Sequence, residues 1–206
     1  MVYTLFTMTK NQTKSLVNFF YELGTLRKVA RSHRQNLLTN DLSDNIASHT
    51  FRVSIIGYFL AELEKANIQK VLLMCLFHDV PESRSGDQNW VHKRYVKVFE
   101  KQILHDQLSP LPFFRNIFNF ITEYVKRETK ESLIAKDADL LDQILLLKEY
   151  ALQGNKEAQV WLKGKDTNKN AQYLMLKTKS AKKLGKLLLN SNPSDWWNNL
   201  STSVRN

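Results

Sequence analysis

The chain has 206 residues, of which 43% are apolar and 24% charged, so it reads as one globular domain with little room for disordered linkers. Its single cysteine, Cys75, excludes an internal disulfide framework and favours a reducing, intracellular setting. The formal net charge of +10 suits an anionic partner but does not distinguish nucleotides, nucleic acid and membrane surfaces.

The ends and the hydropathy of the chain bear on where it acts. The N-terminus has no basic start before an apolar block, so no signal peptide is predicted. No apolar stretch approaches the roughly 20 residues that a membrane span needs. We therefore expect a cytoplasmic protein without a membrane partner. A single domain is expected over 1–206, with a core at about 25–155 and C-terminal helices, 156–206, docked on it.

Helical periodicity runs along almost the whole chain and predicts an all-α fold. A first helix is expected over 15–26. The clearest helix is expected over 43–66, where Ser43 or Asp44 can cap its start. Its apolar stripe follows helical spacing through Ile46, Val53, Ile56, Leu60 and Leu63. His49 falls on the same stripe, so a histidine is expected among core side chains.

Residues 68–79 are apolar on all sides, which predicts a central buried helix that includes a reduced Cys75. Pro81 disfavours the helical conformation at the residue before it. The helix should therefore end or bend just past His78 and Asp79, so that a buried helix ends in a histidine and an aspartate.

Further helices are expected over 90–104 and 113–128, separated by the proline-containing segment 109–112. A long helix from residue 131 should stop at Gly154 and Asn155.

The last quarter of the chain is basic. Residues 151–206 carry ten Lys and Arg residues against Glu157, Asp166 and Asp195, and 174–189 form a basic amphipathic segment. The paired tryptophans that follow are expected to anchor the terminal segment to the core.

Three of the predicted helices bring metal-ligand side chains into apolar surroundings. They contribute His49, the pair His78 and Asp79, and a group of three aspartates: Asp137, Asp139 and Asp142. A buried carboxylate is costly unless it is paired or bound to a cation. Two imidazoles and two carboxylates suit a divalent metal, and such a metal with an open position for water is a hydrolytic centre.

Each of these groups also has an ordinary structural interpretation. His49 could hydrogen-bond a carbonyl in the core, and His78–Asp79 could satisfy groups at a helix end. Aspartates in a helix usually face solvent, and periodicity does not choose among the three.

The ordered segments "NIASH", "FHDVPESRSGD" and "KDAD" resemble the HD-domain superfamily of metal-dependent phosphohydrolases, in particular the branch of 5′-deoxynucleotidases. The resemblance covers roughly residues 25–190 and implies a helical fold with a metal site between helices. It assigns four metal ligands: His49, His78, Asp79 and Asp139. Asp139 is chosen because the family places this aspartate three residues after a lysine, here Lys136. The metal could be Mn, Co, Fe, Ni, Zn or Mg.

The resemblance also implies catalytic and substrate-binding residues. Glu82 would act with Asp79 in catalysis by handling the proton of the attacking water, and Asp87 would lie near the leaving group or sugar. Arg31, with Arg34 as its rival, would contact phosphate.

Lys93 could add positive potential at the mouth of the site, unless it is an ordinary surface charge. The chain departs from the family pattern in two places. It has Ser32-His33 where an aromatic residue often follows the arginine, and Pro81 where small residues are frequent.

The implied function is metal-dependent release of phosphate from nucleoside 5′-monophosphates, including deoxynucleotides. A phosphodiesterase or pyrophosphohydrolase acting on another nucleotide is the alternative within the superfamily. A nucleic-acid binding module that uses the basic C-terminal third is a disfavoured third hypothesis. Relatives are often dimers, so a homodimer is compatible with the resemblance.

Overall fold

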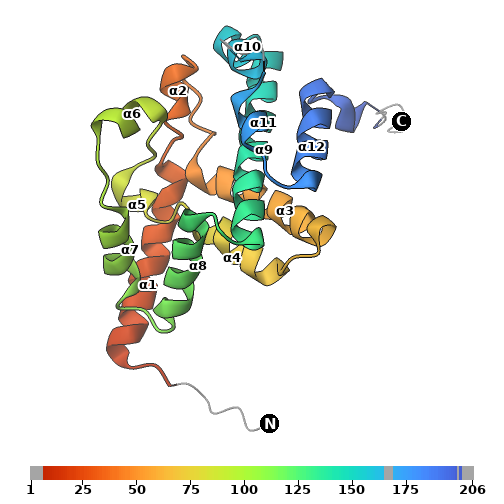
Figure 1. The fold of residues 1–206 in the computed structure, drawn as a ribbon. Coiled ribbons are helices and arrows are strands. Elements are labelled where there is room, and N and C mark those ends of the chain that lie inside the picture. The colour runs from red at the N-terminus through yellow and green to blue at the C-terminus, as the bar shows by residue number, and fades with distance from the viewer. Residues whose placement is uncertain (1–6, 165–168, 199, 201–206) are drawn as a thin grey trace, which may run out of the picture.

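The computed structural model describes residues 7–164, 169–198 and 200, and these residues form helices without a β-sheet (Figure 1). The all-α prediction is confirmed. The first half of the chain contains α1 (Lys10–Gly24), the 3-10 turn η1 (Thr25–Lys28), α2 (His33–Asn36), α3 (Ile46–Glu64), α4 (Ile68–Phe77), α5 (Glu82–Ser85) and α6 (Trp90–Tyr95). The second half contains α7 (Glu100–Leu108), α8 (Phe114–Lys126), α9 (Lys130–Leu152), α10 (Lys156–Lys163), α11 (Ala171–Met175), α12 (Lys179–Asn190) and η2 (Asp195–Trp197).

The centre of the molecule is the packing of α3 and α4 against the long helix α9. Three residues of the predicted α3 stripe are fully buried there: Ile46, Val53 and Leu60. Gly57 permits the close approach of α4, because a Cβ atom at this position would lie 2.6 Å from Cys75 Sγ. This packing fixes the positions of the polar residues that α3, α4 and α9 carry.

Two details of the α3 prediction are wrong. The helix begins one or two residues later than expected, because Asn45, rather than Ser43 or Asp44, accepts a hydrogen bond from the Ser48 backbone and forms the cap. Leu63 is 60% exposed instead of buried. It stands at four-residue spacing from other exposed apolar residues of α3, so it belongs to the neighbouring, outward-facing row. That row is Phe51, Ile55, Phe59 and Leu63.

Helix α4 ends at Phe77 with His78 as its C-cap, which confirms the end predicted from Pro81. Cys75 is buried and has no disulfide, as expected. The helix is not buried on all sides, however, since Leu76 is 47% exposed. Only the face that meets α3 and α9 lies in the core, so the apolar sequence overstated the burial of this helix.

The predicted single helix over 90–104 is two helices, α6 and α7, joined by residues 96–99. Val96 has extended backbone angles (φ −115°, ψ 128°). Two β-branched residues, Val96 and Val98, fall in this junction and have low helix propensity. The separation of α7 from α8 at 109–112 and the end of α9 before Gly154 are as predicted.

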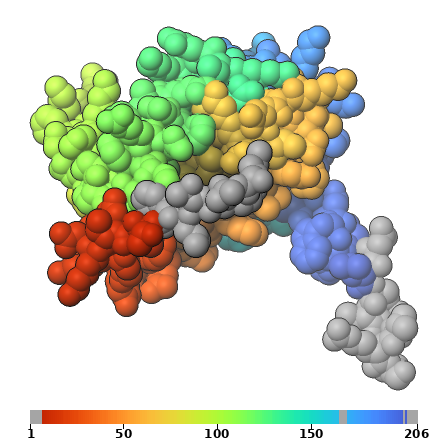
Figure 2. All heavy atoms as spheres, turned by 90° about the horizontal axis from the view of Figure 1, so that it is seen from below, coloured from red at the N-terminus to blue at the C-terminus, as the bar shows by residue number. Residues whose placement is uncertain are grey.

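The C-terminal helices α10, α11 and α12 contact α9. Asp137 of α9 organises this region, because its carboxylate accepts hydrogen bonds from the backbone N–H groups of Lys177 and Thr178 at 2.9 and 2.7 Å. It thereby breaks the basic segment between α11 and α12. Trp196 and Trp197 are 77% and 52% exposed on a segment that extends from the body (Figure 2). The prediction that they anchor the terminus in the core is wrong.

Within the described part of the chain, no helix has both the length and the apolar character that a membrane crossing requires. The homodimer stays a prediction.

Candidate metal centre

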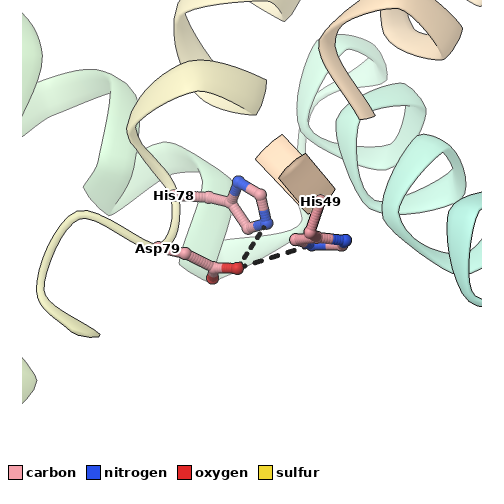
Figure 3. A group of neighbouring side chains, drawn as sticks. All are labelled: His49, His78 and Asp79. Atoms are coloured by element: carbon pink, nitrogen blue, oxygen red, sulfur yellow. Dashed lines mark ion pairs between the residues drawn. The ribbon is translucent and has the colours of Figure 1, made fainter. Parts of the chain in front are cut away.

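Three predicted ligands lie together where α3, α4 and the turn after α4 meet (Figure 3). His49 is on the first turn of α3, His78 caps α4, and Asp79 follows directly. Asp79 Oδ2 lies 3.5 Å from His49 Nε2 and 3.1 Å from His78 Nε2. One candidate ligand atom from each residue lies within 4.8 Å of the other two. The spacing of the three donors is therefore compact enough for a single ion.

The hydrogen bonds of the two imidazoles aim their free nitrogens at this point. His49 Nδ1 lies 2.6 Å from Asp142 Oδ2, and His78 Nδ1 lies 2.8 Å from the carbonyl oxygen of Cys75. An ionised carboxylate and a carbonyl oxygen can only accept, so Nδ1 of each ring donates and carries the proton. In the neutral rings Nε2 then holds a lone pair.

Both of these Nε2 atoms are buried without a hydrogen-bond partner in the described part of the chain. Buried polar atoms are nearly always satisfied. Two imidazole nitrogens without hydrogen-bond partners, placed beside a carboxylate, are a suitable donor set for a divalent cation.

Asp139, the fourth predicted ligand, comes from α9 and reaches the edge of this cluster. Its Oδ1 lies 3.4 Å from His49 Nε2, while its Oδ2 accepts a hydrogen bond from Lys136 Nζ at 2.6 Å. It is not one of the three residues whose ligand atoms are all mutually close. Asp137 is fully buried in the contact with α12 described above, so it does not compete for this position.

The electrostatics of the cluster favour a positive charge at its centre. Burial and Arg31 lower the pKa of His49, but Asp142, Asp79 and Asp139 outweigh them and raise it to about 9. Burial raises the pKa of Asp79, yet His78 and His49 bring it well below its ordinary value. For Asp139, burial is likewise outweighed by Lys136 and the two histidines, which lower its pKa. A divalent cation can supply the charge that a proton on His49 would otherwise supply.

The sequence offered Asp142 only as a candidate metal ligand and did not single out Arg52, yet these two residues hold His49 in place. Arg52, one turn after His49, donates from Nε to Asp142 Oδ1 at 2.5 Å and pairs through Nη1 with Glu149. Asp142 therefore binds both the imidazole and the guanidinium and is only 3% exposed. The available signal was spacing, since Asp142 follows Asp139 by one helical turn and Arg52 follows His49 by the same interval.

Substituting Asp142 with asparagine should weaken metal binding by about 10- to 100-fold, because the imidazole loses the negative partner that makes Nε2 a better ligand. Isothermal titration of the full chain with Co²⁺ measures this affinity. Asp137→Asn is the matched control, as it alters a buried aspartate of α9 that contacts α12 instead. An unchanged affinity in Asp142→Asn would show that Asp142 does not support the centre.

A buried arginine borders the cluster on the side of the segment 86–89. Arg31 is 6% exposed, and its Nε lies 3.6 Å from Asp87 Oδ2. The same carboxylate oxygen accepts hydrogen bonds from the Ser32 backbone and hydroxyl at 2.7 and 3.0 Å. Burial lowers the pKa of Arg31, but Asp87, Asp139 and Asp79 raise it above its ordinary value. Arg31, rather than Arg34, is the arginine that faces the carboxylates of the cluster.

Glu82 begins α5 and lies beside Asp79 and Asp87. Its Oε2 is buried without a hydrogen-bond partner among the described residues. Burial and the charges of Asp79 and Asp87 raise the pKa of Glu82 well above its ordinary value. A buried carboxyl group whose pKa is raised in this way is a candidate for proton transfer. Lys93 is exposed on α6, and its positive charge acts to lower the pKa of Glu82.

A polar network holds the segment that carries Asp79 and Glu82. Glu22 of α1 accepts hydrogen bonds from Ser83 Oγ at 3.0 Å, Arg84 Nε at 2.6 Å and Gln107 Nε2 at 2.7 Å. Gln107 also donates to the carbonyl oxygen of Val80. This network ties α1 and α7 to the turn between α4 and α5, and no motif in the sequence pointed to it.

Comparison with known proteins identifies the family. A family model described as an HD domain matches residues 23–178, a range that contains all the cluster residues above. A 5′-deoxynucleotidase of Erwinia tasmaniensis is 27% identical over 154 residues, which cover 68% of this chain and 76% of that protein. A 5′-deoxynucleotidase of Dictyostelium discoideum is 27% identical over 149 residues, or 66% of this chain and 78% of that protein.

Solved structures share the fold. A predicted metal-dependent phosphohydrolase from Magnetospirillum magnetotacticum matches with a TM-score of 0.67 at 21% identity, covering 88% of this chain and 92% of that one. A conserved hypothetical protein from Pyrococcus furiosus also matches with a TM-score of 0.67 at 21% identity, covering 85% of this chain and 99% of that one. At these identities the similarity concerns the fold alone.

Proposed function

This chain belongs to the HD domain family of metal-dependent phosphohydrolases, and we propose that it releases inorganic phosphate from nucleoside 5′-monophosphates, deoxynucleotides included. The resemblance read from the sequence is thereby confirmed at the level of the family. The names of the two relatives support the substrate class.

His49, His78, Asp79 and Asp139 are proposed to hold one divalent metal, with Mn, Co, Fe, Ni, Zn and Mg all compatible with imidazole and carboxylate ligands. The observation that carries this assignment is the pair of buried Nε2 atoms, on His49 and His78, that face Asp79 and have no hydrogen-bond partner among the described residues. When bound, such a metal supplies Lewis acidity to the phosphoryl group and to the attacking water.

Four further residues are proposed to bind the substrate and to transfer the proton. Arg31 is proposed to bind phosphate oxygens, because a guanidinium offers paired N–H donors that match two phosphate oxygens. The Nε atom of Arg31 also has no hydrogen-bond partner among the described residues. Asp87 pairs with Arg31 and Ser32, so it orients this arginine as well as lying near the sugar or leaving group. Glu82 takes the proton of the attacking water. Lys93 adds positive potential on the outer side, beyond Glu82.

The test is phosphate release from a panel of nucleoside and deoxynucleoside 5′-monophosphates, with Mn²⁺ or Co²⁺ added and then chelated. We expect release that depends on the metal and stops on chelation. A diester such as bis(p-nitrophenyl) phosphate and a nucleoside triphosphate are assayed on the same preparation. Turnover of these in place of monophosphates would instead assign phosphodiesterase or pyrophosphohydrolase chemistry.

A further inference from the structure

Three aromatic side chains from separate helices meet at one end of the molecule. The ring centroids of Trp90 (α6) and Trp161 (α10) are 4.5 Å apart. The ring of His33 (α2) lies 6.1 Å from Trp90 and 5.9 Å from Trp161. Helices α2, α6 and α10 stand at the same end of the molecule (Figure 1). Trp90 is 50% exposed, so part of this aromatic surface is open to a ligand.

The two tryptophans line a cavity of about 590 Å³. This volume is within the range of small-molecule sites, roughly 300–1,000 Å³. The described lining includes three polar residues: Asn36, Glu157 and Gln172. Asn36 Oδ1 is buried and has no hydrogen-bond partner in the described part of the chain. An unsatisfied buried acceptor is costly, so a rearrangement of this side chain that brings Oδ1 to a donor, such as an N–H group of a ligand, would remove that cost.

The aromatic group is joined to residues beside the metal centre by short stretches of chain. His33 follows Arg31 by two residues, a span of at most about 7 Å, and Trp90 follows Asp87 by three, at most about 11 Å. His33 Nε2 also lies 3.2 Å from Gln143 Nε2, and Gln143 stands one helical turn beyond Asp139 on α9. The Cα atoms of His33 and Trp90 therefore lie within about 7 and 11 Å of those of Arg31 and Asp87, separations that one ligand of nucleotide size can span.

We propose that this cavity binds the nucleobase of the substrate, which stacks on the Trp90–Trp161 pair while its edge meets the amide groups of Asn36 and Gln172. The inference rests on the proposed function and extends it, because it makes the base a recognised part of the substrate. Bases stack on indole rings whatever their identity. A second phosphate is a poor fit, since the described lining contains the carboxylate of Glu157 and no lysine or arginine.

The kinetic test compares a nucleotide with the same phosphoester lacking a base. We expect Trp161→Leu and Trp90→Leu each to lower kcat/KM for deoxyadenosine 5′-monophosphate by about 5- to 150-fold, the loss of one stacking contact. Activity on deoxyribose 5-phosphate should stay within about twofold of the unmodified chain. Trp161→Phe should restore most of the loss, because a phenyl ring still stacks.

Trp196→Leu is the matched control, as Trp196 is exposed on the segment around η2 and does not line the cavity. If Trp90→Leu and Trp161→Leu each lose as much kcat/KM on deoxyribose 5-phosphate as on the nucleotide, the base site is overturned while the proposed phosphohydrolase activity stands. Should the unmodified chain hydrolyse neither compound, the proposed function fails and the base site is judged by binding. Deoxyadenosine should then quench tryptophan fluorescence in the unmodified chain and much less in Trp90→Leu, and absence of quenching would overturn the inference.

Discussion

Replacing Asp79 with alanine should remove metal binding and lower phosphate release by about a thousandfold or more. Asp79 is the carboxylate that lies against the Nε2 atoms of both His49 and His78. A metal that polarises a phosphoryl oxygen contributes several kcal/mol to the stabilisation of the transition state, and each 1.36 kcal/mol is a factor of ten in rate. The change is measured as metal content after gel filtration and as initial rates of phosphate release.

Asp106→Ala is the matched control for this substitution, since Asp106 is an exposed aspartate on α7. It should leave metal content and rate unchanged. Circular dichroism of both variants separates a lost metal from a lost fold. Undiminished turnover in a metal-free Asp79→Ala preparation would contradict the proposed centre.

Glu82→Gln should lower kcat by about 100- to 10,000-fold while metal content stays the same. Glutamine keeps the size of the side chain but cannot take the proton of the attacking water, and general base catalysis is worth a rate factor of this order. Burial, Asp79 and Asp87 raise the pKa of Glu82, which brings the carboxylate nearer to the pH at which a base works best. The rate and the bound metal are measured on the same preparation.

Glu100→Gln, in the first turn of α7, is the control for the chemical change. Its rate should equal that of the unmodified chain. A Glu82→Gln variant with full activity would show that Glu82 is not the base, and one with reduced metal content would show that it supports the metal instead.

The sequence marked His49 and the pair His78–Asp79 as polar residues in apolar helices, and the resemblance to the HD-domain superfamily, not their spacing, assigned them as metal ligands. His49 on a core-facing stripe and His78–Asp79 at the end of an apolar helix are costly placements without a partner. The choice among Asp137, Asp139 and Asp142 could not be made from periodicity, since each residue of the group has different neighbours brought by other helices. Asp137 meets the backbone before α12, and Asp142 meets His49 and Arg52. Only tertiary packing separates these environments.

The longer helices were predictable in order more than in number or extent, since the short helices α2 and α5 were not predicted. The stripe of α3 and the stop before Gly154 depend on local sequence, and both were predicted. The break between α6 and α7 and the exposure of Leu63, Trp196 and Trp197 depend on which surfaces other helices cover. The Glu22 network and the Trp90–Trp161 pair join residues that are 61 to 85 positions apart and 71 positions apart, respectively. No local pattern could have brought these together.

The most direct test of the metal centre is a Co²⁺ titration of the metal-free full chain, with bound metal and phosphate release from deoxyadenosine 5′-monophosphate followed together. The rate should rise in proportion to bound Co²⁺, reach its plateau at one metal per chain and return to background on chelation. Turnover by protein shown to contain no metal would contradict the account. Stoichiometric Co²⁺ with no turnover of any phosphomonoester would contradict it as well.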